Sequence, residues 1–437
     1  MERIVSEAKK KELNYEVFFT KEETKSLNFE QSELKDISHK IIEGIGVRLI
    51  HNGRMGASSS NNVSNLEVLD FALNSARFGK EVQFTFPELP LHSESFGDSK
   101  SELEFEKLYP VINEIVRYLE NKYQGKVDLS LTQMKLYQKL TNYRCENYIE
   151  RNTTFFDFGL SLFSVTSSGF LITYSWSWKK SGLTSDDLWN ITRKMEQTLV
   201  NYDKIAKITS GRYKVIFSPY ALLSTLGITI SSGVNGFNLA RRMSPLLSKL
   251  NEKILNEKIN ITDDPNLDTP SKRGFDDEGL RTAKRSIIEN GTLKDYILNL
   301  DSAAELKMNP TGNGIRYSFS SLPLPGFHNF AVQEGERSLK DIIRGMDNAI
   351  LFLIPIGEGQ SNIIMGDYSL NVGLGYYVEN GEIVGRVKDT MISGNVYTDF
   401  QEVLEISKDT ELLMSRGYNT FFNLPFIIVD NVSVTTK

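Results

Sequence analysis

Six short motifs follow one another between residues 274 and 395: Gly274-Phe275-Asp276-Asp277-Glu278-Gly279, Glu289-Asn290-Gly291-Thr292-Leu293-Lys294-Asp295-Tyr296, Pro310-Thr311-Gly312-Asn313-Gly314, Met365-Gly366-Asp367-Tyr368-Ser369, Val378-Glu379-Asn380-Gly381-Glu382-Ile383 and Ile392-Ser393-Gly394-Asn395. Asn-Gly pairs tolerate the positive φ angles of tight turns, so several of these motifs are predicted to join short strands. We therefore expect residues 209–437 to form a mainly β domain. Its helices are predicted over 220–232, 240–257, 338–347 and 398–408, and a buried strand over 426–429.

The first 208 residues are expected to form an α+β domain with two related halves. A helical connector over 101–123 joins the halves, because its apolar residues recur at helical spacing. A helix follows the strands of each half, capped by Ser64 in the first and by Thr184 in the second. Strands are predicted over 14–20, 25–32, 41–51 and 54–60, then over 127–138, 141–150, 153–166 and 169–178, with a tight turn at 167–169. The predicted fold class is α+β.

Composition and charge limit the classes of protein to which this chain can belong. The chain has 437 residues, of which 40% are hydrophobic, as is typical of a globular protein with a sizeable core. Its net charge of −6 lacks the basic character of nucleic-acid-binding proteins. The single cysteine, Cys145, excludes an internal disulfide and is interpreted as an inert thiol. The charged N-terminus is unlike a signal peptide, and no apolar run approaches the roughly 20 residues that span a bilayer, so a soluble cytoplasmic protein is expected.

Two of the motifs carry residues suited to contact with a ligand. Asp276-Asp277-Glu278 is dense enough in carboxylates for a hard cation or for acid–base chemistry, although such clusters are also common in solvated turns. Pro310-Thr311-Gly312-Asn313-Gly314 offers free backbone amides to a peptide or an anion, with Arg316 as the nearest positive charge. A plain tight turn is the alternative. Trp176 and Trp178 alternate along one strand face and are expected to fill a core or an interface.

The order and spacing of the six motifs resemble the TldD/PmbA (TldE) family, whose members form two-subunit metalloproteases. The segment from Glu43 to Leu49 also matches a family pattern, so the resemblance covers nearly the whole chain. In the catalytic subunits of that family, a His-Glu-x-x-x-His helix follows the first strand of the C-terminal domain. The corresponding positions of this chain hold Ser224, Thr225 and Thr229.

The residues at those positions decide the expected metal content. A catalytic zinc needs three protein ligands and an open position for water, and hydroxyl side chains are poor zinc ligands and no substitute for a carboxylate base. Residues 414–419 also lack the cysteine that the catalytic subunits carry near the C-terminus. The four histidines are scattered along the sequence, at His39, His51, His92 and His328. The chain therefore resembles the PmbA/TldE type of subunit, with no metal or cofactor of its own and zinc expected in the partner.

The resemblance implies a non-catalytic subunit that helps a TldD-like partner to enclose unfolded peptides, which would bind as added strands. It also implies a structural role near the subunit junction for residues 276–278. The predicted substrate-binding residues are Thr311, Gly312, Asn313, Gly314 and Arg316, with Gly394 and Asn395 in support, and no catalytic residue is predicted. A stand-alone homodimeric peptide-binding protein is the alternative. The family's older label, modulator of DNA gyrase, finds no support in the charge pattern, and neither nucleic acid nor a membrane is expected as a partner.

Overall fold

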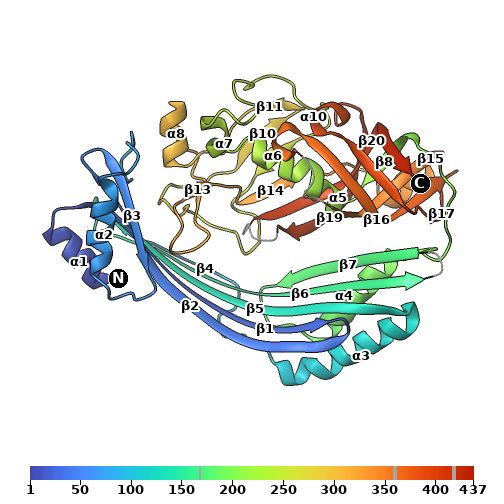
Figure 1. The fold of residues 1–437 in the computed structure, drawn as a ribbon, viewed down its shortest axis with the longest axis horizontal. Coiled ribbons are helices and arrows are strands. Elements are labelled where there is room, and N and C mark those ends of the chain that lie inside the picture. Colours follow the sequence, from blue (N-terminus) through green and yellow to red (C-terminus); the bar gives the residue numbers. More distant parts are fainter. Residues whose placement is uncertain (167–168, 358–361, 416–419) are drawn as a thin grey trace.

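The computed structural model describes residues 1–437 except 167–168, 358–361 and 416–419 (Figure 1). A curved seven-stranded sheet occupies the N-terminal part, with the order β3-β2-β1-β5-β6 and with β4 and β7 both beside β6. Neighbouring strands are antiparallel except β4 and β6. The strands are β1 (Asn14–Glu30), β2 (Glu33–His51), β3 (Arg54–Ser60), β4 (His92–Phe96), β5 (Gly125–Asn142), β6 (Ile149–Thr166) and β7 (Gly169–Lys179).

The length of these strands corrects the predicted boundaries. β1 is a single strand where two were predicted, because every residue from Asn14 to Glu30 pairs with β2. β5 likewise continues to Asn142, and β6 begins only at Ile149. Each half therefore has three strands and not four, and β1 and β5 lie side by side in the middle of the sheet. The predicted turn at 167–169 falls largely outside the described residues, and the common origin of the halves stays a prediction.

Four helices accompany this sheet: α1 (Glu2–Lys10), α2 (Glu67–Ala76), α3 (Phe105–Tyr123) and α4 (Ser185–Gln197). The predicted connector is α3, and Thr184 caps α4 as predicted, since its side chain accepts a hydrogen bond from the Asp187 backbone N–H. The predicted Ser64 cap is wrong, because α2 begins after Leu66 without a side-chain cap. Phe71, expected in the apolar stripe of α2, is 57% exposed.

The two faces of the N-terminal sheet differ because successive side chains of a strand point to opposite sides. Apolar residues of the convex face pack in one cluster with α3 and α4: Leu27, Phe29, Leu129, Leu131, Phe156, Phe158 and Leu160. The concave face turns toward the C-terminal part of the chain (Figure 1). Its middle carries half-buried polar side chains: Ser26, Asn28, Ser130, Thr132 and Asp157. One face thus belongs to a core, and the other is polar.

An eleven-stranded sheet fills the C-terminal part. Nine of its strands follow the order β11-β10-β9-β14-β20-β18-β16-β15-β8, and β17 pairs with β16 and β19 with β20. Because β20 also pairs with β8, five of these strands close into a barrel-like ring. The strands are β8 (Gly211–Phe217), β9 (Ile261–Asp263), β10 (Arg285–Glu289), β11 (Thr292–Leu293), β14 (Asn329–Val332), β15 (Asn348–Ile356), β16 (Asp367–Glu379), β17 (Glu382–Arg386), β18 (Thr390–Asn395), β19 (Val403–Met414) and β20 (Phe421–Thr436). A separate pair is formed by β12 (Gly314–Ile315) and β13 (Leu324–Pro325).

The predicted helix over 220–232 is present as α5 (Pro219–Leu222), a π-helical turn (Leu223–Gly227) and α6 (Ile228–Gly233). The other described helices of this part are α7 (Gly236–Ala240), α8 (Leu300–Leu306), α9 (Leu339–Arg344), α10 (Val396–Asp399) and the 3₁₀ turn Ile363–Met365. The prediction of a helix over 240–257 is wrong, because backbone groups there bond to residues 291–293. The prediction over 398–408 is also wrong, since β19 begins at Val403.

The structure confirms the α+β class. Among the residues that it describes, no helix combines the length and apolar character needed to cross a membrane.

Candidate functional site

The acidic motif lies buried between the two sheets, so its interpretation as a solvated turn is wrong. Asp276, Asp277 and Glu278 are 1%, 2% and 0% exposed. Buried carboxylates need compensating charge, and here it comes from segments far apart in sequence. We call the resulting set the charged junction: Glu16, Arg48, Arg151, Arg273, Asp276, Asp277, Glu278 and Arg316.

Ion pairs across the charged junction join the two sheets. Arg48 of β2 donates to both carboxylate oxygens of Glu16 at 2.6 and 2.9 Å and lies 2.9 Å from Glu278. Arg151 of β6 donates to Asp277 at 3.1 Å. The backbone N–H of Arg316 also donates to Asp277, at 2.9 Å, and its guanidinium donates to Glu16. The motif therefore holds the N-terminal sheet against the C-terminal part.

The pKa values of the three carboxyls shift in different directions because their surroundings differ. Burial favours the neutral form of Asp277, but Arg273 and Arg151 outweigh it and hold the pKa of Asp277 below its ordinary value. Burial and the neighbouring Glu278 raise the pKa of Asp276 to about 8. Burial also raises the pKa of Glu278, against the pull of Arg48. The motif thus combines a carboxyl whose pKa is lowered with two whose pKa values are raised.

The structure places the predicted substrate-binding segment in the interior. Thr311, Asn313 and Arg316 are 4%, 1% and 4% exposed, and Gly312 and Gly314 are buried. The Asn313 amide donates to Asp263 at 2.6 Å and to the Gly326 carbonyl. The Gly314 N–H donates to Asp276 at 2.8 Å, and the Gly312 carbonyl lies 2.8 Å from His328 Nε2. These groups already have protein partners, so peptide contact by this segment stays a prediction, and the structure gives it an internal supporting role.

Gly394 and Asn395 lie at the end of β18, where both are half-buried. The Asn395 side chain accepts from the Tyr397 N–H and so caps α10. Its amide donates to the Met365 carbonyl and to Asp367, both at 2.8 Å. Asn395 therefore ties the end of β18 to the 3₁₀ turn and to the first residue of β16, and the predicted supporting contact with peptide is untested.

Two glycines of β2 allow the C-terminal part to approach the concave face. A Cβ on Gly46 would lie 2.0 Å from the Phe319 carbonyl oxygen, and one on Gly44 would lie 2.6 Å from the Phe319 ring. Close packing thus explains the two glycines in the segment from Glu43 to Leu49, because only glycine leaves room at both positions.

We expect Gly46→Ala to lower the free energy of unfolding by about 1–3 kcal/mol, because a backbone carbonyl must move to admit the methyl group. Urea denaturation measures the change. Gly211→Ala is a suitable control, since its Cβ would meet only the Tyr213 ring at 3.6 Å, an ordinary contact. An equal effect of the two substitutions would contradict the packing argument.

The helical segment 219–233 carries the three hydroxyl residues that stand at the positions of a metal motif. Ser224, Thr225 and Thr229 are all buried. The Ser224 hydroxyl donates to the Tyr220 carbonyl at 3.2 Å, and the Thr225 hydroxyl to the Ala221 carbonyl at 2.7 Å. Hydroxyls bonded to their own helix are poor zinc ligands, so the donor set of this segment does not fit a catalytic zinc.

The histidines do not supply a ligand set elsewhere. His39 lies 2.8 Å from Glu23, and His92 lies 3.2 Å from Glu94. His328 is buried, and burial together with the charge of Arg273 lowers its pKa to about 3. Over the described parts of the chain, no three His, Cys, Asp or Glu side chains gather as metal ligands do.

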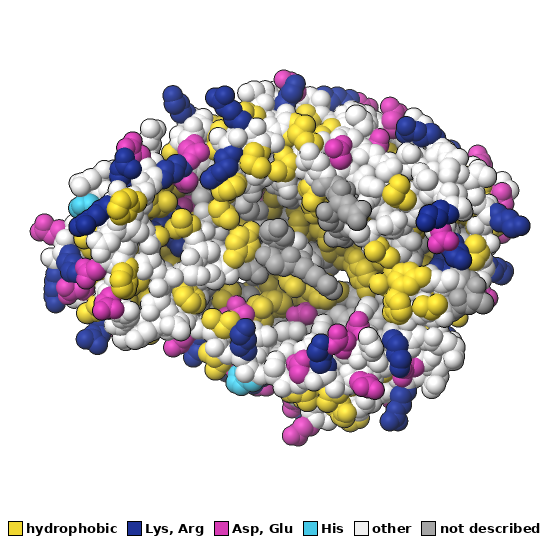
Figure 2. Space-filling view, viewed as in Figure 1, with side chains coloured by type: hydrophobic (Ala, Val, Ile, Leu, Met, Phe, Trp, Pro, Cys, Tyr) yellow, Lys and Arg dark blue, Asp and Glu magenta, His cyan; other side chains and the backbone are white. Residues whose placement is uncertain are grey.

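A hollow opens between the concave face and the C-terminal part (Figure 2). At one end of the concave face the charged junction holds the two parts together. At the other end, aromatic rings of β7 meet the C-terminal part: Trp178 and Phe421 lie 5.8 Å apart, and Tyr174 and Tyr220 lie 4.4 Å apart. The tryptophans therefore fill an interface, as the sequence predicted. Between these two contacts the sheet presents its polar middle.

The polar middle includes a carboxyl group, that of Asp157. The Trp176 indole N–H donates to it at 3.4 Å, and burial raises its pKa to about 7. No motif marks this group in the sequence, because its environment depends on Trp176 of the neighbouring strand β7.

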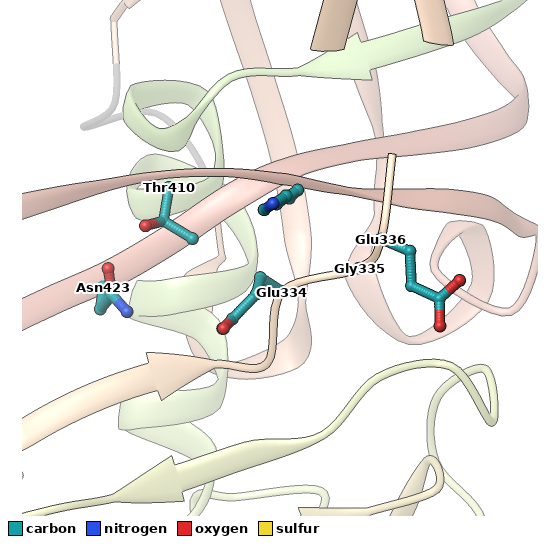
Figure 3. A pocket seen from close by; sticks show the side chains of 6 residues that line it. Glu334, Gly335, Glu336, Thr410 and Asn423 are labelled. Atoms are coloured by element: carbon teal, nitrogen blue, oxygen red, sulfur yellow. The ribbon is translucent and has the colours of Figure 1, made fainter. Parts of the chain in front are cut away.

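A second hollow, of about 490 Å³, lies on the C-terminal sheet beside the end of β14 (Figure 3). Its lining is polar: Glu334, Gly335, Glu336, Lys408, Thr410 and Asn423. It contains none of the residues predicted to bind substrate, and no motif in the sequence marks it. Its open, charged lining lacks the apolar surface that small-molecule sites usually offer.

Comparison with known proteins identifies the family. The model of the PmbA/TldA metallopeptidase C-terminal domain matches residues 210–436, more than half of the chain, and that of the PmbA/TldA metallopeptidase domain 1 matches residues 15–78. The chain belongs to the PmbA/TldA metallopeptidase family. The first match spans the C-terminal sheet, and the second spans β1 to α2.

Relatives of this PmbA/TldA family chain include proteins named as TldD homologs and proteins named as PmbA homologs. An uncharacterized protein of Methanocaldococcus jannaschii is 26% identical over 93% of this chain and 94% of its own length. A zinc metalloprotease TldD homolog of Saccharolobus solfataricus is 26% identical over 88% and 86%. A metalloprotease PmbA homolog of Buchnera aphidicola is 31% identical, but over only 47% and 43%.

The fold is shared with solved structures. The crystal structure of TldE from Thermococcus kodakarensis superposes with a TM-score of 0.83, at 22% identity, and the match covers 100% of this chain and 99% of the other. A Thermotoga maritima protein described as a candidate modulator of a DNA gyrase gives the same TM-score at 21% identity, over 99% of each chain. At these identities the likeness concerns the fold alone.

Proposed function

We propose that this chain is the non-catalytic subunit of a TldD/TldE-like metalloprotease complex. The observation that carries the proposal is the set of buried hydroxyls at residues 224, 225 and 229, two of which donate to carbonyls of their own helix. A neutral hydroxyl in that state neither holds a zinc ion nor serves as a general base. Membership of a metallopeptidase family supports a role in proteolysis. In this proposal a partner subunit supplies the metal and its chemistry.

The hollow above the polar middle of the N-terminal sheet is the surface that we assign to peptide binding. Serine, threonine and asparagine side chains offer hydrogen bonds to any extended main chain without selecting one side chain. Such a surface suits an unfolded peptide better than a folded protein. In this proposal the chain encloses and positions the peptide, and the partner cleaves it.

Co-expression with a family member that carries the His-Glu-x-x-x-His helix tests the proposal. We expect the two chains to purify together, with about one zinc ion per pair, and we expect this chain alone to hold no stoichiometric zinc and to have no peptidase activity. Zinc bound stoichiometrically by the chain alone, together with hydrolysis, would overturn the proposal. A stable homodimer that binds peptides but never a metal-bearing partner would favour the alternative, a stand-alone peptide-binding protein.

We further expect Ser26→Trp to reduce peptide processing by the complex about tenfold or more, because an indole on the concave face would occupy space intended for peptide. Lys25→Trp is the matched control, since the adjacent residue of β1 points to the opposite face. Steady-state kinetics of the two complexes, each checked for normal zinc content, measures the difference. An equal loss of peptide processing in both variants, or a loss in neither, would contradict the assignment of the hollow to peptide binding.

A further inference from the structure

The carboxyl group of Asp157 has no charged partner. It is half-buried on the concave face, and among the described residues its one hydrogen bond comes from the Trp176 indole N–H, at 3.4 Å. No lysine, arginine or histidine nitrogen of those residues lies within 4.0 Å of its oxygens. Glu16 and Asp277 of the charged junction, by contrast, each meet arginines. A carboxylate that has lost water without gaining a cation is unfavourable.

Aromatic and small residues surround this carboxyl group. Strand register places Thr132 of β5 opposite Asp157 on one side and Trp178 of β7 opposite it on the other. The next residue of β6 on this face is Gly159, which has no side chain. The Trp176 indole lies beside that glycine, because a Cβ there would be 3.6 Å from Trp176 Cδ1. Asp157 therefore stands at the foot of an aromatic wall made by the two indoles.

The C-terminal part of the chain holds this wall in place. The Phe421 ring of β20 lies 6.2 Å from the Trp176 ring and 5.8 Å from the Trp178 ring. Both indoles nevertheless remain half-buried, and hydrophobic side chains border the hollow in Figure 2. Apolar rings displace water from the neighbourhood of the carboxyl group, and opposite charges attract each other more strongly there than in water.

We propose that Asp157 and the two indoles form a subsite for a lysine or arginine side chain of the bound peptide. Such a side chain has an apolar stem and a charged end. The stem suits the aromatic wall, and the charged end supplies the cation that Asp157 lacks. The other side chains of the polar middle are neutral and do not repel a cation: Ser26, Asn28, Ser130 and Thr132. This inference rests on the proposed function, because it names the class of peptide that the hollow accepts.

Peptide binding by the full chain tests the subsite. The probe is an unstructured peptide with an acetylated N-terminus, a dye at its C-terminus and one lysine as its only cation. The comparison peptide carries norleucine in place of the lysine, which keeps the apolar stem and removes the ammonium group. Fluorescence anisotropy gives the two dissociation constants. We expect the lysine peptide to bind about tenfold more tightly, because a hydrogen bond between charged groups is stronger than the contact that replaces it.

Asp157→Asn should remove this preference. The substitution should weaken binding of the lysine peptide about tenfold and change binding of the norleucine peptide by less than about twofold. Asp186→Asn is the matched control, since Asp186 is exposed in the first turn of α4, which packs on the opposite face of the sheet. It removes the same charge and should leave the preference unchanged. Circular dichroism confirms that both variants are folded.

The outcomes separate this inference from the proposed function. Equal binding of the two peptides, or a lysine preference that survives Asp157→Asn, would overturn the subsite alone. Equal weakening of both peptides by Asp157→Asn would also overturn it, because that result is expected of a protonated carboxyl group that donates to the peptide main chain. Failure to bind either peptide would overturn the assignment of the hollow to peptide binding and the subsite with it, whereas the role as a subunit is tested by co-purification.

Discussion

Replacement of Asp277 by alanine is expected to lower the free energy of unfolding by about 3–5 kcal/mol. The carboxylate accepts from Arg151 at 3.1 Å and from the Arg316 backbone N–H at 2.9 Å, and lies 3.5 Å from Arg273. Its removal leaves two buried guanidinium groups with too little negative charge around them. Arginine does not release its proton in a protein, so the chain has no means of neutralising them.

Urea denaturation near neutral pH measures the loss, and Asp389→Asn is the control, because asparagine tolerates the positive φ angle of this position. Asp389 is 60% exposed and lies 3.9 Å from Lys388, so loss of its charge should cost no more than about 0.5 kcal/mol. Because the folded-state pKa of Asp277 is depressed, its contribution is present above the unfolded-state pKa of about 4 and is lost as the pH falls through the folded value. The penalty should therefore stay constant from about pH 8 to pH 5. A loss similar to that of the control would show that the charged junction contributes little.

Replacement of Arg48 by methionine should have a comparable effect at high pH but a different dependence on acid. Methionine fills much of the volume, but Glu278 loses the cation that lies 2.9 Å away. Glu16 loses its two hydrogen bonds from Arg48 and keeps the one from Arg316. The penalty should reach about 3–5 kcal/mol near pH 8. Unlike an arginine, the carboxyl that is left behind can be neutralised by taking up a proton.

The direction of this pH dependence follows from the linkage between proton binding and folding. The folded-state pKa of Glu278 is already raised by burial, and loss of Arg48 raises it further. A raised carboxyl pKa gives stability that is complete below the unfolded-state value and is lost as the pH rises toward the folded-state value. The Arg48→Met penalty should therefore shrink by at least about 1 kcal/mol from pH 8 to pH 5. One substitution leaves buried positive charge unpaired, and the other leaves a buried carboxylate unpaired. If the stability penalties of the Arg48 and Asp277 variants depended on pH in the same way, this conclusion would be contradicted.

Local signals in the sequence predicted those features that depend on a few neighbouring residues. The capping box at Thr184 and the connector helix over 101–123 are both present. Asn52-Gly53, Asn290-Gly291 and Asn380-Gly381 all take the positive φ angles of turns. Strand lengths were harder to predict, because the charged residues in the middle of β1 indicated a loop between two strands. Pairing with β2 on one side and with β5 on the other keeps them in the strand.

The chemistry of the junction could not be predicted from the acidic motif alone. Whether three adjacent carboxylates are solvated or buried depends on what lies opposite them. The arginines that meet them come from β2, from β6 and from either side of the motif itself. The prediction of free backbone amides at 310–314 failed for a similar reason. The Gly314 amide looks available in the sequence, but in the fold it donates to Asp276.

The π-helical turn at Leu223–Gly227 bears on how catalytic and non-catalytic members of this fold differ. In an α-helix, residues five apart point about 140° away from each other, whereas a turn closed by i→i+5 bonds sets them roughly one above the other. Positions 224 and 229 are five apart. The wider turn therefore brings them nearer to one side of the helix, as two imidazoles bound to one ion would require. A catalytic zinc also needs a third protein ligand, so changing residues 224, 225 and 229 alone would not complete a zinc site in this chain.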